Sequence, residues 1–350
     1  MKRSLRRRLL TFAAALAIAA IAVALLRPAP PAAQRELTGR TMGTAYSVKY
    51  RPAPGAPAPA DLQAEVDRLL AQINRILSTY DPDSELSRFN RARTTDPVAI
   101  SPALHTVLRT ALLVGEQSQG AFDVTVGPLV NLWGFGPDPR NDRIPAPADL
   151  AAAGRRVGHD KLELRHAPPT LRKTRADVYV DLSAIAKGYG VDRVSALLEA
   201  HGLEHHLVEI GGEVRARGRN ARGERWRIAV ERPLSTGRSL GPLLALDEAA
   251  IATSGGYRNF FTVGGRRYAH VIDPVSGWPV RNRAASVSVV ADSCMLADAW
   301  ATALLVQGPE RGMATAERLG LAALFIVEHE GRLEGRASRA LRAYREVASP

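Results

Sequence analysis

One acidic side chain stands alone in a long apolar stretch near the C-terminal end of the sequence. In the segment from Cys294 to Val306, which is expected to form a helix, Asp298 is the single charged residue. Thr302 follows four residues later, so in a helix its hydroxyl shares a face with the Asp298 carboxylate. Carboxylate and hydroxyl oxygens suit a hard divalent cation such as Mg²⁺. The spacing leaves two interpretations open. Either these residues bind a metal, or Asp298 faces water or pairs with an arginine while Thr302 bonds the carbonyl four residues earlier.

A second segment has the composition of an anion-binding turn. Residues 181–192 follow an apolar run at 178–180, and they combine small residues with Lys187. A buried strand that turns into a helix offers backbone N–H groups to an anion, and Lys187 would add a mobile positive charge. The segment is not a Walker A loop, because the GxxxxGK[ST] spacing is absent. An ordinary strand-to-helix turn with an exposed lysine is the alternative.

Histidines and aromatic residues form the remaining candidates. His270 ends an expected strand and precedes an Asp-Pro turn, where an imidazole at the edge of a cleft could accept a proton near neutral pH. A structural role is the alternative. Trp133 and Phe135 could pack against a bound ring or fill the core. His205 and His206 are adjacent, so in a strand they would lie on opposite faces and could not chelate one metal together.

The elements that must position these residues are a mixture of helices and antiparallel strands. Apolar spacing predicts helices at 62–77, 104–119, 184–200 and 294–306, and strands at 36–50 (interrupted at 42–44), 178–180, 207–210 and 321–327. Between residues 211 and 290, short strand-like runs alternate with Gly pairs at 211–212, 255–256 and 264–265, which predicts antiparallel hairpins. Because strands and helices do not alternate regularly, the fold class is expected to be α+β.

The N-terminus has the pattern of an export signal. Five cationic residues precede an uncharged, largely apolar run of 18 residues from Leu9 to Leu26. This run is short for a membrane span and long for a cleaved signal. The alternatives are therefore an uncleaved anchor helix with the body outside the cytoplasm, or cleavage near Ala33. Since no cysteine stands near the end of the run, a lipobox anchor is excluded. We expect a signal or anchor at 1–34 and one domain at 35–350.

Composition restricts the class of protein. With 350 residues, 46% hydrophobic and 23% charged, the chain is neither disordered, collagen-like nor a multi-span membrane protein. The net charge of +12 falls to +6 when the six basic residues of the first 33 are set aside. Such a mildly basic body could favour anionic ligands, and its charge alone does not indicate nucleic-acid binding. A single cysteine, Cys294, allows no intramolecular disulfide, so a packed core must stabilise the fold.

Taken in order, the candidate segments resemble the FAD:protein FMN transferase (ApbE) family. The resemblance spans about residues 40–306, and eight short stretches carry it. These stretches are 42–44, 78–85, 122–135, 181–192, 209–212, 252–257, 270–274 and 297–302. Members of that family are exported, face the periplasm and have a T-fold-like architecture. The resemblance thus implies a T-fold-like flavin transferase domain at 35–350, on the periplasmic side of the bacterial inner membrane.

The resemblance also implies an activity. It is the Mg²⁺-dependent transfer of FMN from FAD to a Thr or Ser hydroxyl of an acceptor protein, with release of AMP. The implied partners are flavoprotein subunits of membrane redox complexes, and not nucleic acid. His270 matches the suspected general base. By position, the FAD contacts are Met42, Tyr80, Ala121, Phe122, Asp123, Asp181, Lys187 and Ile272, and the Mg²⁺ ligands are the Ala184 carbonyl, Asp298 and Thr302.

Departures from the family pattern leave these side chains in place. Ser183-Ala184 stands where relatives often have a Gly pair, and Gly256 where many have Asp. Two alternatives remain open. A Mg²⁺-dependent FAD pyrophosphatase would use water as the acceptor and yield FMN and AMP. A non-catalytic flavin-binding or assembly protein would not need Asp298, Thr302 and His270, so their presence favours catalysis.

Overall fold

A computed structural model of the chain describes residues 33–137, 142–234, 237–257 and 259–345. The expected signal or anchor at 1–34 therefore falls almost wholly outside the described residues. Within the described ranges, no helix is both long enough and apolar enough to span a membrane.

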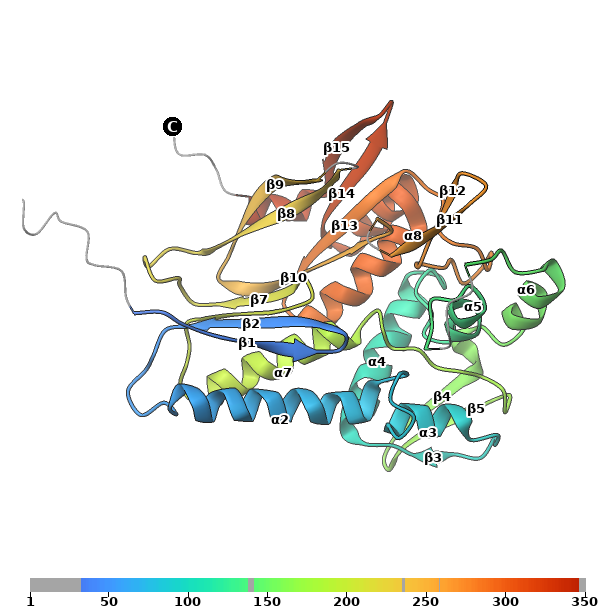
Figure 1. Cartoon of the computed structure of the whole chain (residues 1–350), viewed down its shortest axis with the longest axis horizontal. Helices are drawn as coiled ribbons and strands as arrows, with labels where there is room; N and C mark the ends of the chain where they lie inside the picture. The colour runs from blue at the N-terminus through green and yellow to red at the C-terminus, as the bar shows by residue number, and fades with distance from the viewer. Residues whose placement is uncertain (1–32, 138–141, 235–236, 258, 346–350) are drawn as a thin grey trace, which may run out of the picture.

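An eight-stranded antiparallel sheet forms the centre of the fold (Figure 1), in the order β1-β2-β6-β7-β10-β13-β14-β15. Its strands are β1 (Arg35–Thr41), β2 (Thr44–Tyr50), β6 (His206–Ile210), β7 (Glu213–Arg217), β10 (Glu248–Gly255), β13 (Ala284–Ala291), β14 (Ala322–His329) and β15 (Arg332–Ala337). Side chains alternate between the two faces of a strand. In β14, Phe325 packs into one hydrophobic core and Leu324 into a second core across the sheet. Both faces of the sheet are therefore covered.

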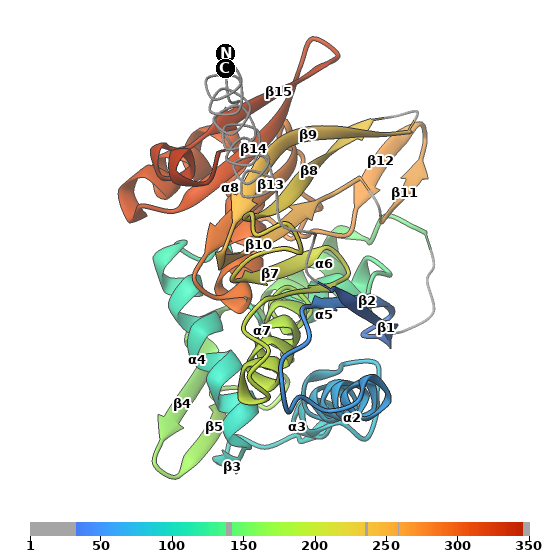
Figure 2. The ribbon, with the colours of Figure 1, turned by 90° about the vertical axis from the view of Figure 1, so that its left-hand side faces the viewer.

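Helices cover one face, and a β-hairpin covers the other (Figure 2). The helical layer consists of α2 (Pro59–Leu77), α4 (Pro102–Gln117), α7 (Ala186–Ala200) and α8 (Cys294–Leu319). The opposite layer consists of β8 (Trp226–Leu234), β9 (Gly237–Leu246) and the 3₁₀ helix η2 (Arg339–Tyr344). The burial pattern of α2 follows its apolar spacing, with Leu62, Val66 and Leu70 all buried against the sheet.

Two smaller groups of elements lie beside the helical layer (Figure 1). A side lobe of α5 (Gly127–Leu132), α6 (Pro147–Gly154), β11 (Phe260–Val263) and β12 (Arg266–Ala269) has its own core. Trp133 is fully buried there and stacks on Tyr268 at 5.6 Å, so it fills the core. The second group is α3 (Glu85–Arg91), β3 (Val98–Ala99), the short helix η1 (His159–Lys161), β4 (Leu162–His166) and β5 (Pro169–Lys173).

The α+β prediction is confirmed, and most predicted elements lie within two residues of their observed bounds. The interruption at 42–44 is the turn between β1 and β2. The last helix is longer than predicted, since α8 continues to Leu319 across a break at Gly308, whose φ is 77°, before Pro309. The predicted helix at 294–306 is the part before that break.

Two predictions about local structure were wrong. Val178 and Val180 are buried, but residues 178–180 do not form a strand. The side-chain amide of Asn90 instead satisfies both main-chain groups of Val180, donating to its carbonyl and accepting from its N–H at 2.8 Å each. The Gly pair at 255–256 is not a hairpin turn, because Gly255 ends β10, which pairs with β7 and β13.

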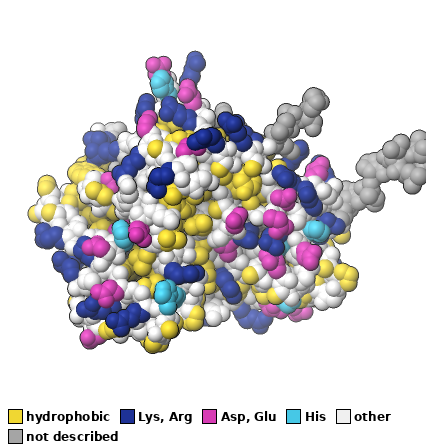
Figure 3. Space-filling model, turned by 180° about the vertical axis from the view of Figure 1, so that it is seen from behind, with side chains coloured by type: hydrophobic (Ala, Val, Ile, Leu, Met, Phe, Trp, Pro, Cys, Tyr) yellow, Lys and Arg dark blue, Asp and Glu magenta, His cyan; other side chains and the backbone are white. Residues whose placement is uncertain are grey.

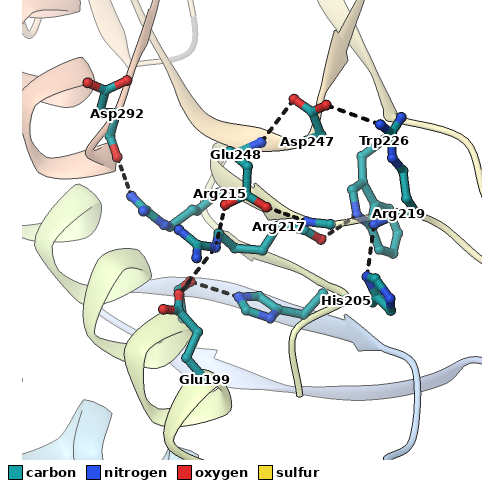
Figure 4. A network of polar contacts seen from close by, with 12 residues as sticks. Glu199, His205, Arg215, Arg217, Arg219, Trp226, Asp247, Glu248 and Asp292 are labelled. Carbon is teal, nitrogen blue, oxygen red and sulfur yellow. Dashed lines mark hydrogen bonds and ion pairs between the residues drawn. The ribbon is translucent and has the colours of Figure 1, made fainter. Parts of the chain in front are cut away.

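Ion pairs tie the elements together at the surface. In Figure 4, Arg217 of β7 lies between Glu199 of α7, at 3.5 Å, and Glu248 of β10, at 2.9 Å. On the face seen in Figure 3, basic and acidic side chains are interspersed. Exposed pairs of this kind contribute little individually, so the hydrophobic cores dominate stability.

Candidate active site

A cleft of about 1090 Å³, the main cleft, opens between the central sheet, α8 and the side lobe. Its size matches a cofactor or nucleotide site, for which about 300–1,000 Å³ is common. All twelve residues that the sequence singled out as site residues line it. They are Met42, Tyr80, Ala121, Phe122, Asp123, Asp181, Ala184, Lys187, His270, Ile272, Asp298 and Thr302.

Two helices meet at a glycine to build the floor of this cleft. The N–H of Gly188 in α7 donates to Oδ2 of Asp298 in α8 at 3.0 Å. A Cβ atom on Gly188 would lie 2.3 Å from the carbonyl oxygen of Cys294. Only glycine therefore allows the helices to approach closely enough for this hydrogen bond.

One further residue of α7 fixes the N-terminus of α8. The Asp192 carboxylate accepts hydrogen bonds from the N–H groups of Cys294 and Met295 and from the hydroxyl of Ser293, each at 2.9 Å. These are donors that the start of a helix leaves without partners. Arg215 donates to Asp192 at 2.9 Å. It also donates to the main-chain carbonyl of Asp292 at 2.6 Å (Figure 4).

Two buried carboxyl groups in the main cleft face a single lysine. Asp298 is 2% exposed and Glu213 3%. Lys187 Nζ lies 2.9 Å from Glu213 Oε1 and 3.8 Å from Asp298 Oδ1. Burial raises the pKa of both carboxyl groups, and Lys187 opposes that rise. Although burial alone would lower it, the pKa of Lys187 is raised by the two carboxylates. The structure thus places Lys187 in two ion pairs.

The remaining oxygen donors suit a cation. One lysine faces two carboxylates, and Glu213 Oε2 has no hydrogen-bond partner in the described part of the chain. Thr302 Oγ1 lies 2.8 Å from Ser254 Oγ, so a pair of hydroxyls adjoins Asp298 in the lining. Among the described residues, no three His, Cys, Asp or Glu side chains gather as a metal site. A cation here would bind carboxylate, hydroxyl and carbonyl oxygens, as Mg²⁺ does together with water and phosphate.

The histidine of the main cleft has a defined tautomer. His270 Nδ1 lies 3.2 Å from the carbonyl of Asn259, which also accepts the His270 N–H at 3.0 Å. Since a carbonyl can only accept, Nδ1 carries the proton and Nε2 is left as the basic nitrogen. Burial lowers the pKa of His270, and the nearby Lys187 lowers it further. His270 is therefore neutral at pH 7 and can accept a proton.

The other predicted positions form the walls of the main cleft. Tyr80 is 64% exposed, and its hydroxyl donates to the carbonyl of Phe135 at 3.3 Å, bridging α2's end and the side lobe. The Asp123 carboxylate is already occupied by hydrogen bonds within the protein. Its carboxylate accepts from the N–H and hydroxyl of Thr125, at 2.7 and 2.5 Å, and from the N–H of His159 at 2.8 Å. This carboxylate therefore joins the segment at 123–125 to the start of η1 at His159.

Three contributors were missed by the sequence reasoning. Glu213 follows directly after the 209–212 motif. A charged residue at the start of a strand, just after a Gly pair, was the sequence signal that could have identified it. Ser254 lies inside another motif, but only the position of β10 beside α8 brings it to Thr302. Asn259 acts through its main chain, for which side-chain identity gives no signal.

Comparisons with known proteins agree on one family. A model of the ApbE family matches residues 42–325. The FAD:protein FMN transferase of Vibrio cholerae serotype O1 is 46% identical over 90% of this chain and 93% of its own length. That of Haemophilus influenzae is 41% identical over 89% and 91%. The solved flavin transferase ApbE from Vibrio cholerae has a TM-score of 0.84 at 45% identity, covering 90% of this chain and 100% of its own. The apo flavinyl transferase ApbE of Pseudomonas stutzeri has a TM-score of 0.83 at 38% identity, covering 91% and 99%.

Gly188→Ala tests the helix contact. The added methyl would meet the main chain of Cys294, and overpacking of this kind costs about 1–3 kcal/mol. We expect a lower midpoint of urea unfolding, although alanine favours a helix over glycine by about 1 kcal/mol.

Gly190→Ala is the matched control in the same helix. There the methyl would meet the ends of the Met42 and Ile210 side chains at 3.1 and 3.3 Å, which can adjust. Equal unfolding midpoints for the two variants would contradict the proposed need for glycine at position 188.

Proposed function

We propose a specific reaction for this chain, which belongs to the ApbE family and is an FAD:protein FMN transferase. In that reaction, FMN is transferred from FAD to a Thr or Ser hydroxyl of an acceptor protein. Mg²⁺ is the cofactor and AMP is the second product. One observation carries this proposal. The crossing of α7 and α8 collects Asp298, Thr302, Ala184 and Lys187 in a cleft that His270 also lines. Charge-stabilising groups for a pyrophosphate and a base for a hydroxyl thus share one cavity.

In the proposed reaction, the acceptor oxygen attacks the phosphorus on the FMN side of the FAD pyrophosphate. The bond between that phosphorus and the bridging oxygen breaks, and AMP leaves with the bridging oxygen. The acceptor's hydroxyl proton goes to Nε2 of His270, which is the free nitrogen of the ring because Nδ1 donates to the Asn259 carbonyl. The products are a phosphoester between FMN and the acceptor, and AMP.

The proposed Mg²⁺ site consists of the Asp298 carboxylate, the Thr302 hydroxyl and the Ala184 carbonyl. The unbalanced charge around Lys187 and the buried unpartnered oxygen of Glu213 support a cation at this position. When bound, Mg²⁺ neutralises charge on phosphate oxygens. Lys187, which Glu213 and Asp298 hold in place, adds a fixed positive charge for the phosphates.

We also propose that residues 1–34 export the chain to the periplasmic side of the bacterial inner membrane, where it stays anchored or is released by cleavage. The basic residues before an 18-residue apolar run support export. The acceptors would then be exported flavoprotein subunits of membrane redox complexes.

Asp298→Asn tests the metal site, because it removes the charge and preserves the shape. We expect the transfer rate at ordinary Mg²⁺ to fall by about 10²–10³, which is the usual cost of removing one group that stabilises charge in the transition state. More Mg²⁺ should also be needed for half-maximal rate. Asp149→Asn, on an exposed residue of α6, is the matched control. Wild-type Mg²⁺ dependence in Asp298→Asn would rule out this ligand.

His270→Ala tests the base. A positioned base contributes about 10²–10⁴ to the rate, so most of the transfer should be lost while FAD still binds. Because a base works unprotonated and burial lowers the pKa of His270, the wild-type rate should fall only below about pH 6.5. The variant should lack this acid limb, and His329→Ala, on an exposed histidine in β14, should keep it. A His270→Ala variant that binds FAD poorly would make the residue a binding residue instead.

A reporter fusion tests export. Residues 1–40 fused to an enzyme that is active only outside the cytoplasm should give activity, whereas residues 35–40 alone should give none. Mass spectrometry of the mature N-terminus then distinguishes an anchor from a cleaved signal. Activity confined to the cytoplasm would contradict the proposal.

A further inference from the structure

A second hollow, the side groove, adjoins the main cleft. It has a volume of about 440 Å³, and its walls include Trp278, Pro279, Arg281, Val306 and Gln307. Val306 also lines the main cleft, so the two hollows share a wall. None of the residues assigned above to flavin, metal or base lines the side groove.

Arg281 is the polar group of the side groove that can bind a further ligand, whereas Gln307 is enclosed. Arg281 is exposed, and its guanidinium lies over the ring of Trp278 at 4.4 Å. Among the described residues, no carboxylate pairs with it. Gln307 donates through Nε2 to the carbonyl of Ser118 at 2.9 Å, while its buried Oε1 has no partner in the described part of the chain. The protein encloses that oxygen, so a chain docked in the groove does not reach it.

The other polar side chains of the side groove are already engaged. Asn282 donates to the carbonyl of Leu305 at 2.7 Å and accepts from the N–H of Ala284 at 2.9 Å. Asp273 accepts through Oδ1 from the N–H of Val275 at 3.0 Å, and Ser276 Oγ accepts from the N–H of Trp278 at 3.3 Å. The groove therefore offers a planar cation, which fits an acidic side chain of a polypeptide.

The side groove lies next to the base. The N–H of Val280 donates to the carbonyl of Val271, the residue after His270, at 2.9 Å. The groove wall at 278–280 is thus hydrogen-bonded to the segment at 271–273 like two neighbouring strands. The backbones of neighbouring strands lie about 4.8 Å apart. A chain bound along the wall would come within side-chain reach of His270.

An exposed apolar residue marks the turn between the groove and the cleft. Val275 is 81% exposed at the tip of the turn that connects the two paired segments. Tyr80, also in the lining of the main cleft, is 64% exposed. An acceptor protein seated over the side groove would cover Val275 and bury apolar surface there.

We propose that the side groove docks the acceptor protein. An extended acceptor segment places an acidic side chain against Arg281, which brings its Thr or Ser hydroxyl to His270. This inference rests on the proposed transferase function and adds the acceptor's site and charge to it. Recognition of the acceptor is thereby separate from flavin binding.

The test is Arg281→Glu in the full chain, with FAD, Mg²⁺ and an exported flavoprotein acceptor. We expect the KM for the acceptor to rise about 10-fold or more, as for the loss of an interface arginine, while FAD affinity and kcat at saturating acceptor stay within twofold. Arg332→Glu makes the same charge change at the far edge of the sheet, in β15, and should leave all three unchanged. An acceptor whose acidic residues beside the modified Thr or Ser are changed to lysine should regain affinity for Arg281→Glu.

Each other outcome has a separate meaning. An unchanged acceptor KM in Arg281→Glu, with transfer intact, would overturn the side groove as the docking site and leave the transferase function standing. A loss of FAD affinity or of kcat would also overturn it, because Arg281 would then belong to the flavin site. A wild-type chain that attaches no flavin to any acceptor would overturn the proposed function itself.

Discussion

The contact between α7 and α8 at Gly188 sets the geometry of the whole site. A hydrogen bond from a main-chain N–H to the buried Asp298 carboxylate requires the two helix backbones to touch, and a side chain at position 188 would prevent it. Asp192 lies one turn further along the same face of α7 and caps α8. The two helices are therefore fixed at two levels, which determines where every donor on α8 points.

This crossing also explains why so much charge is buried in one place. Lys187 precedes Gly188, so the same contact that holds Asp298 brings the lysine beside it, and Glu213 approaches from β7 of the sheet. Two carboxyl groups face one ammonium group in a site of low exposure, where negative charge is costly and the pKa of each carboxyl group is raised. Binding of a divalent cation would lower that cost, which supports the metal site that we propose.

The sequence could predict site residues whose side chains lie close together on a single helix. Asp298 and Thr302 stand four residues apart on an apolar helix, and this spacing alone places them together. Glu213 could not be found in this way, since only the three-dimensional pairing of its strand brings it to Lys187. The failed strand prediction at 178–180 has a similar cause, because a distant asparagine side chain, Asn90, replaces the neighbouring strand that the apolar run appeared to require.

The most direct measurement is a single-turnover reaction of the purified chain with FAD, Mg²⁺ and an exported flavoprotein subunit of a membrane redox complex. In-gel fluorescence and mass spectrometry follow the acceptor, and chromatography follows the nucleotides. The account predicts a covalent flavin on one Thr or Ser, a mass gain of FMN less one water, and one AMP released per flavin attached. Conversion of FAD to FMN and AMP with no flavin on the acceptor would contradict it and make water the acceptor.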